Sequence, residues 1–130
     1  MHLHTLNKPV DINTDIYLVD TFGETKSFLK FSKIAFMGKS MFAHGGQNPL
    51  EAARLGNRII HGPNIENFTE VYDFIKKQGI STKINSYKDL ENLVVKFERK
   101  KNYSQKIIKK LAYIGNQILK NNEKEINKYC

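Results

Sequence analysis

Apolar residues along this chain fall into short continuous runs and into helically spaced positions, a pattern typical of strands that alternate with helices. The runs predict strands over residues 15–19, 34–37 and 58–61, and a weaker edge strand over 82–84. Because strand and helix alternate, we predict an α/β fold in which a Rossmann-like parallel sheet is flanked by helices.

Helices are predicted between and after these strands, where apolar residues recur every three or four positions. The clearest face belongs to a helix that begins at Asn67 and ends at Gly79, and it carries Phe68, Val71, Tyr72 and Ile75. The last helix has a narrow apolar stripe of Ile107, Leu111, Ile114 and Ile118. We divide the chain into an irregular segment (1–14), a Rossmann-like domain (15–100) and a basic helical tail (101–130).

Four predicted helix starts share one short motif, in which Asn, Ser or Thr is followed three residues later by an acid. This spacing fits a capping box, where the two side chains satisfy free backbone amides at the helix start. For Glu24 and Glu51 two interpretations stay open, a capping role and a functional role. The pairs are Thr21 with Glu24, Asn48 with Glu51, Asn67 with Glu70, and Ser86 with Asp89.

The segment His-Gly-Gly-Gln-Asn-Pro-Leu-Glu over residues 44–51 carries the strongest functional signal. It places two glycines between a buried strand and a helix start, so backbone amides and the positive end of a helix dipole point toward one place, where an anion would bind. Gly23, just before Glu24, forms a second such loop. We expect both loops at the carboxyl ends of neighbouring parallel strands, where open α/β sheets bind ligands.

Composition favours an anionic partner. The chain has 130 residues, 40% of them hydrophobic, which suits one folded domain. Its net charge of +8 favours nucleic acid, phosphorylated metabolites or an acidic membrane surface. Much of this charge lies late, and a solvated helix face also explains it. The late cations are Arg99, Lys100, Lys101, Lys106, Lys109, Lys110, Lys120, Lys124 and Lys128.

Nucleic acid is the weaker of these expectations. Tyr103, Tyr113 and Tyr129 lie among the lysines, but no RNA- or DNA-binding signature accompanies them. The chain also contains no apolar run long enough to span a bilayer and no signal peptide, so we expect any membrane association to be peripheral or through a partner.

The histidines and the cysteine predict no metal site. His2 and His4 lie in the irregular start, and no pair of His or Cys has ligand spacing. His44 is an acid, a phosphate contact or a loop filler, and His61 is either a site residue or a packed one. Cys130 is the only cysteine, which excludes an internal disulfide and fits a reducing compartment.

The order and spacing of several motifs resemble those of the 3-deoxy-D-manno-octulosonic acid (Kdo) transferases of lipopolysaccharide synthesis. The resemblance runs over residues 15–97, and its most specific part is the segment that ends in Asn-Pro-Leu-Glu. The matching segments are residues 20–24, 36–40, 44–51, 62–63 and 67–68.

This resemblance implies part of a two-domain glycosyltransferase of the GT-B kind. In that family the C-terminal domain binds the donor, CMP-Kdo. The N-terminal domain binds the lipid A precursor and carries the glutamate proposed as catalytic base. We expect the chain to be the later part of a C-terminal domain, to need no cofactor besides the donor substrate, to contain no catalytic residue, and to be inactive without an N-terminal half.

The resemblance also implies a donor site. The glycine amides would face the donor's phosphate or carboxylate, Asn48 would cap the helix and shape the loop, and Glu51 would bind the ribose hydroxyls. The expected donor-binding residues are Gly23, Glu24, Gly45, Gly46, Gln47, Asn48 and Glu51.

The chain departs from the family pattern at two of these segments. Lys39 stands where the family commonly has glycine, and Gln47 where many members have histidine. We also expect the opening strands of the domain, with their Pro-Arg-His-Pro segment, to be missing.

The resemblance implies partners and a location as well. The partners are CMP-Kdo, a lipid A precursor held by the N-terminal domain, and an anionic membrane surface, at the cytoplasmic face of the inner membrane. The alternatives are a non-catalytic remnant or nucleotide-binding module, and a basic interaction domain for nucleic acid or anionic lipid.

Overall fold

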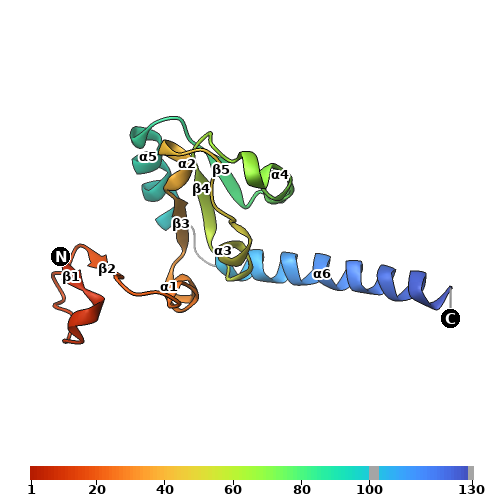
Figure 1. Cartoon of the computed structure of the whole chain (residues 1–130), viewed down its shortest axis with the longest axis horizontal. Coiled ribbons are helices and arrows are strands. Elements are labelled where there is room, and N and C mark those ends of the chain that lie inside the picture. The colour runs from red at the N-terminus through yellow and green to blue at the C-terminus, as the bar shows by residue number, and fades with distance from the viewer. Residues whose placement is uncertain (100–102, 129–130) are drawn as a thin grey trace.

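Three parallel strands form the centre of the molecule in a computed structural model that describes residues 1–99 and 103–128 (Figure 1). They are β3 (Ile34–Met37), β4 (Arg58–His61) and β5 (Ser81–Lys83), in that order across the sheet. The bounds predicted for β3 and β4 are confirmed. β5 begins and ends one residue earlier than predicted, and it is an edge strand as expected.

Helices follow each strand and cover the sheet. One of them, α2, was not predicted, because it is only four residues long and has no helical apolar pattern. Two 3-10 turns accompany the helices, η1 (His4–Leu6) and η2 (Glu66–Phe68). The α-helices are α1 (Thr25–Phe31), α2 (Lys39–Phe42), α3 (Leu50–Arg54), α4 (Thr69–Lys77), α5 (Tyr87–Glu98) and α6 (Tyr103–Asn127).

Hydrophobic side chains pack against both faces of the sheet. Ile59 and Ile60 are adjacent in β4 and both fully buried, because successive side chains of a strand point to opposite faces. Ile59 packs in a cluster with residues of α3, α4 and α6, whereas Ile60 packs in a second cluster with Phe97 of α5. In Figure 1, α4 and α5 accordingly lie on opposite sides of β4.

The N-terminal segment is more regular than predicted, and it forms a second sheet. Residues 1–14 were expected to be irregular, but β1 (His2–Leu3) pairs in parallel with β2 (Tyr17–Leu18). His2 stacks on Tyr17, with ring centroids 5.2 Å apart. Because β2 pairs with β1 and not with β3, the prediction that the Gly23 loop and the Gly45–Gly46 loop end neighbouring strands is wrong.

Only one of the four predicted capping boxes is confirmed. Ser86 accepts from the Asp89 amide, and the Asp89 carboxylate accepts from the Ser86 amide, at the start of α5. The other three helices begin two to four residues after the Thr or Asn, and their N-cap residues are Glu24, Pro49 and Phe68, without side-chain cap bonds. Four-residue motifs occur often by chance, and the preceding turn decides where a helix begins.

The C-terminal helix α6 is partly covered and partly free. Ile107, near its start, is buried in the main core, whereas Ile118 is 54% exposed. Figure 1 shows the second half of α6 extending away from the rest of the protein. The predicted tail positions Lys100, Lys101, Tyr129 and Cys130, and the side chain of Tyr103, lie outside the described residues. Across the described helices, none combines the length and apolar character needed to cross a membrane.

Candidate functional site

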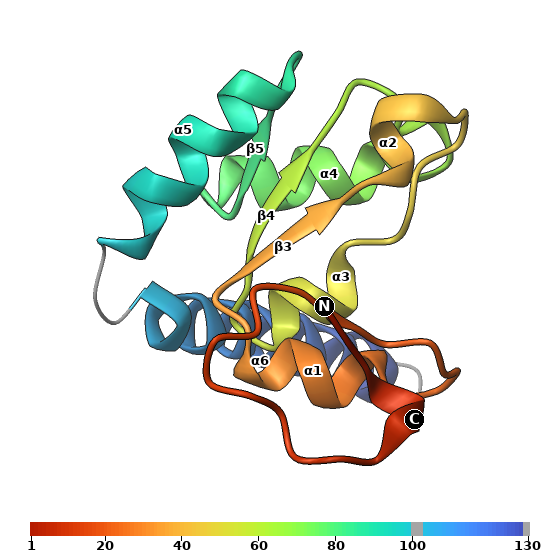
Figure 2. The ribbon, with the colours of Figure 1, turned by 90° about the vertical axis from the view of Figure 1, so that its left-hand side faces the viewer.

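The glycine loop lies at the carboxyl end of the sheet, as an α/β ligand site requires. Figure 2 shows α2 at the end where β3 and β4 finish, and α1 and α6 at the end where they begin. Gly45 and Gly46 follow α2, and both have positive φ, at 92° and 70°. A Cβ on Gly46 would lie 2.7 Å from the carbonyl oxygen of Asn64. The two glycines therefore let this loop pack against the loop that follows β4.

The amide of Gly45 already binds a carboxylate from the same chain. It donates to Glu66 Oε2 at 2.7 Å, and His44 Nδ1 lies 3.6 Å from Glu66 Oε1. The pKa of Glu66 is lowered, first by its own backbone amide, then by that of Gly45, and then by His44. We expected free amides at this point. The loop does hold an anionic oxygen, but in this structure the oxygen belongs to Glu66.

Glu66 was missed by the sequence interpretation, because it lies 21 residues from Gly45 and belongs to no recognisable motif. The only signal for it is its place in a polar loop that directly follows a buried strand. His44 contacts Glu66 while its side chain stays 97% exposed, so all three alternatives for it, an acid, a phosphate contact and a loop residue, stay open.

Two side-chain hydroxyl groups connect the segments around the glycine loop. Ser40 is fully buried in α2, where its Oγ donates to the Met37 carbonyl and accepts from the Gly62 amide at 2.6 Å. Tyr72 of α4 donates its hydroxyl to the Gln47 carbonyl at 3.0 Å. Burial raises the pKa of Tyr72 to about 12, so this hydroxyl stays protonated and remains a donor at neutral pH. These contacts fix the shape of the glycine loop.

His61 is a packed residue. It is 4% exposed, its Nδ1 lies 2.7 Å from the Gly62 carbonyl oxygen, and its ring centroid lies 4.3 Å from that of Tyr72. Its pKa is lowered, mainly by burial, which outweighs the opposing effect of the hydrogen bond to the Gly62 carbonyl; the charges of Lys83 and Lys76 lower it by less.

We expect His61 to make stability depend on pH. The unfolded chain, with a histidine pKa near 6.5, binds the proton more readily than the folded one, so the free energy of unfolding falls as pH drops below about 6.5. His61→Phe should flatten this dependence in urea titrations between about pH 7 and 5. His44→Phe, at an exposed position, should keep it. An unchanged slope in the His61 variant would contradict this assignment.

The other predicted residues of the loop, Gln47, Asn48 and Glu51, make different contacts. The Gln47 side chain accepts from the Lys39 amide at 3.3 Å, and Asn48 accepts from the Leu50 amide at 3.0 Å. Glu51 lies exposed in the first turn of α3, and within the described residues its carboxylate makes no hydrogen bond or ion pair. The capping interpretation of Glu51 is therefore wrong, and its carboxylate is available to a ligand.

Gly23 and Glu24 lie between the N-terminal sheet and α1. Glu24 accepts from the Thr21 hydroxyl and lies 3.0 Å from His4 Nε2. These contacts, first with Thr21 and then with His4, lower its pKa. Gly23 has a φ of 82°, and nothing lies within 4 Å of the place a Cβ would take. The structure thus brings Gly45, Gly46, Gln47, Asn48 and Glu51 together and gives Glu24 a structural role elsewhere.

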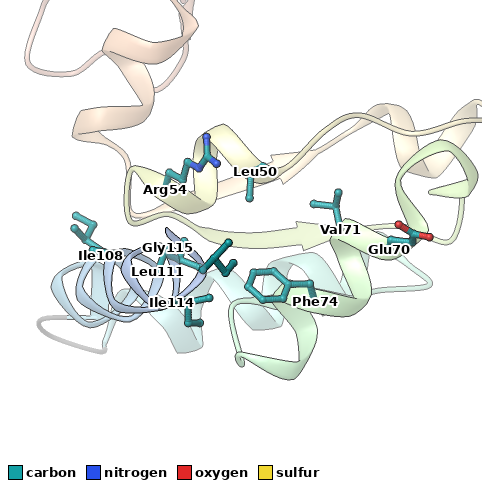
Figure 3. A pocket seen from close by; sticks show the side chains of 11 residues that line it. Leu50, Arg54, Glu70, Val71, Phe74, Ile108, Leu111, Ile114 and Gly115 are labelled. Carbon is teal, nitrogen blue, oxygen red and sulfur yellow. The ribbon is translucent and has the colours of Figure 1, made fainter. Parts of the chain in front are cut away.

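An apolar cavity of about 610 Å³ lies between α3, α4 and α6 (Figure 3). Phe74 and Leu111 contribute large apolar side chains to it, and among the described residues that line it only Arg54 and Glu70 are charged. Nucleotide sites have several converging polar groups, which this cavity lacks. Within the described part of the chain, no group of three or more His, Cys, Asp or Glu side chains could hold a metal ion.

Comparison with known proteins gives one consistent set of relatives. No family model matches the chain. It is 35% identical over 117 residues to a 3-deoxy-D-manno-octulosonic acid transferase of Rickettsia prowazekii (strain Madrid E), covering 88% of this chain and 24% of that relative. It is 37% identical over 78 residues to the Haemophilus influenzae protein of the same name, covering 59% of this chain and 18% of that relative. The chain thus spans about a quarter of the length of the first relative.

A solved structure supports the fold. The C-terminal CMP-Kdo binding domain of WaaA from Acinetobacter baumannii superposes with a TM-score of 0.74 at 20% identity, covering 82% of this chain and 56% of that one. At this identity the likeness establishes architecture. It confirms the predicted α/β class, with a parallel sheet flanked by helices and a helical C-terminal tail. The domain boundaries predicted at residues 15 and 100 stay predictions.

Proposed function

Because the chain belongs to the family of the 3-deoxy-D-manno-octulosonic acid transferases, we propose that its glycine loop binds the donor CMP-Kdo in the transfer of Kdo to a lipid A precursor. The observation that carries this proposal is the exposed Glu51 carboxylate, which has no hydrogen-bond or ion-pair partner among the described residues and follows the buried glycine loop at the carboxyl end of the sheet. An acceptor group for sugar hydroxyls and an amide that already holds an anionic oxygen are what a sugar nucleotide needs.

Different residues of the loop bind different parts of the donor. Glu51 accepts hydrogen bonds from the ribose hydroxyls. The Gly45 amide binds a phosphate or carboxylate oxygen of the donor, which takes the place of the Glu66 carboxylate. Asn48 and Gln47 hold the loop in shape through the Leu50 and Lys39 amides. Gly23 and Glu24 lie apart from this loop. In the proposal they contact the donor only if another part of the enzyme brings them to it.

The chemistry places a further requirement on the enzyme. Transfer needs a base that deprotonates the acceptor hydroxyl, so that its oxygen bonds to the sugar as CMP leaves. Glu24 and Glu66 are held by partners within the chain, and Glu51 faces the donor, so none is assigned as this base. The chain contributes donor orientation and stabilisation of the departing CMP. The base and the acceptor site come from the N-terminal part of the enzyme.

The test is calorimetric titration of the full chain with CMP. Glu51→Gln should weaken binding by about tenfold, because a hydrogen bond to a charged acceptor contributes about 1.5–3 kcal/mol. Glu70→Gln is the matched control, since Glu70 is likewise exposed in the first turn of a helix. Equal CMP affinity in the wild type and the Glu51 variant would refute the role of this carboxylate.

The proposal extends to a membrane surface at the cytoplasmic face of the inner membrane. Lysines of α6 recur at helical spacing on its polar side, and near an anionic surface each contributes about 1 kcal/mol. They are Lys106, Lys109, Lys110, Lys120 and Lys124, and Lys128 directly follows the helix.

We expect the chain to sediment with vesicles that contain an anionic phospholipid, and to be released by salt. The double variant Lys120→Gln and Lys124→Gln should weaken this binding by about tenfold or more. The matched change at Lys26 and Lys30 of α1 should have little effect. Equal binding to neutral vesicles, or release by neither salt nor the α6 variant, would refute this part of the proposal.

A further inference from the structure

The Glu66 carboxylate takes the place that an anionic ligand of the glycine loop would occupy. Its Oε2 accepts from the Gly45 amide at 2.7 Å, and its Oε1 lies 3.6 Å from His44 Nδ1. A carboxylate that presents its two oxygens to two neighbouring nitrogen groups has the charge and the hydrogen-bonding pattern of a bound carboxylate or phosphate ligand. The loop therefore already contains an anion, which the chain itself supplies.

The backbone on both sides of Glu66 is held in place, whereas its side chain is free to turn. The Asn64 amide donates to the Ser40 carbonyl at 3.0 Å, and the Asn67 amide donates to the Gly45 carbonyl at 3.3 Å. The side chain of Glu66 is nevertheless 54% exposed. Rotation about its side-chain bonds can thus release the Gly45 amide without a change in either loop, and exposed side chains make such rotations within nanoseconds.

The Gly45 amide needs an acceptor whether this comes from the chain or from a ligand. Gly45 is buried, and a buried amide that loses its hydrogen bond costs free energy. An incoming anion has to replace the Glu66 carboxylate at this amide, because two negative groups a few ångströms apart repel each other. Since only the displaced form accepts the ligand, the observed affinity is reduced in proportion to the fraction of chains in which Glu66 has turned away.

We propose that Glu66 is an autoinhibitory residue of the donor site, which competes with the anionic group of a ligand for the Gly45 amide. This inference rests on the proposed function, and it adds the residue that regulates the affinity of that site. The competition lowers the affinity for every ligand that needs this amide and leaves the affinity for other ligands unchanged. Because the departing CMP carries a phosphate, the same competition limits how tightly the loop retains it after transfer.

The experiment compares CMP with cytidine, which lacks the phosphate, by calorimetric titration of the full chain. Glu66→Gln keeps the length of the side chain and an oxygen that accepts from the Gly45 amide, but it removes the negative charge. It should raise the affinity for CMP by about tenfold and leave the affinity for cytidine unchanged. Tenfold is near the lower end of what a hydrogen bond with one charged partner contributes, as fits a half-exposed carboxylate. Glu66→Ala should act in the same direction.

Glu70→Gln is the matched control, because it removes the same charge from an exposed glutamate four residues further along the chain. It should change neither affinity. If Glu66 only holds the loop in shape, both Glu66 variants should bind CMP as tightly as the wild type or more weakly, which would refute the inference while the proposed function stands. An equal gain in affinity from Glu70→Gln would refute it as well. If neither the wild type nor the Glu66 variants bind CMP, both the inference and the proposed function are refuted. Circular dichroism establishes that each variant is folded.

Discussion

Gly46→Ala should be among the most destabilising single substitutions in this chain. Gly46 has a φ of 70°, where a side chain is strained, and a Cβ there would meet the Asn64 carbonyl oxygen at 2.7 Å and Ile65 Cα at 3.1 Å. The left-handed backbone costs about 1–2 kcal/mol and the overpacking about 1–3 kcal/mol more. The clash involves backbone atoms, which a rotamer change cannot relieve. The free energy of unfolding, measured by urea titration, should fall accordingly.

Substitutions at two other glycines measure the cost of backbone strain separately from the cost of a steric clash. Gly23 also has positive φ but meets nothing within 4 Å, so Gly23→Ala should cost only the conformational part, about 1–2 kcal/mol. Gly115 lies within α6 with nothing within 4 Å, and Gly115→Ala should stabilise the helix by about 0.5–1 kcal/mol. Gly46→Ala with a stability equal to that of Gly23→Ala would show that the two loops are not packed against each other.

The 130-residue chain should not transfer Kdo when it is assayed alone. In the proposal the active site lies between a donor-binding and an acceptor-binding part. The carboxylates of Glu24 and Glu66 have other partners, and that of Glu51 faces the donor. Purified chain, CMP-Kdo and a lipid A precursor should give no product above a blank without protein. The assay is repeated with the N-terminal domain of a Kdo transferase relative added as a separate chain.

Product that forms only with the added domain would support the proposal that this chain binds the donor and the N-terminal domain binds the acceptor. Glu51→Gln in that mixture should then reduce turnover, whereas Glu70→Gln should not. Turnover by the chain alone would contradict the proposal, because it would require a base and an acceptor site among residues for which the structure provides other roles.

The central sheet could be predicted from sequence because its signals are local. β3 and β4 are short apolar runs with polar or glycine boundaries, and both were placed correctly. The Ser86–Asp89 capping box was also local and was confirmed. The pairing of β2 with β1 was not predicted, because pairing depends on contacts between distant residues that no short motif encodes.

The glycine loop of the candidate site could be predicted from the sequence, whereas the residues that contact the loop could not. The glycines of the loop were recognised, yet their immediate function is to pack against Asn64 and to bind Glu66. The hydrogen bond from the Gly62 amide to Ser40 arises only when α2 meets the residue that follows β4. Sequence patterns thus identify which residues have unusual backbone requirements. The fold decides which other residues share their surface.

Amide chemical shifts of the ¹⁵N-labelled chain, followed during titration with CMP, would locate the donor site residue by residue. We expect saturable changes centred on the amides of Gly45, Gly46 and Glu51, and none along α6. Changes confined to the lysines of α6, or no changes at concentrations that saturate other nucleotide-binding domains, would contradict a donor site at the carboxyl end of this sheet.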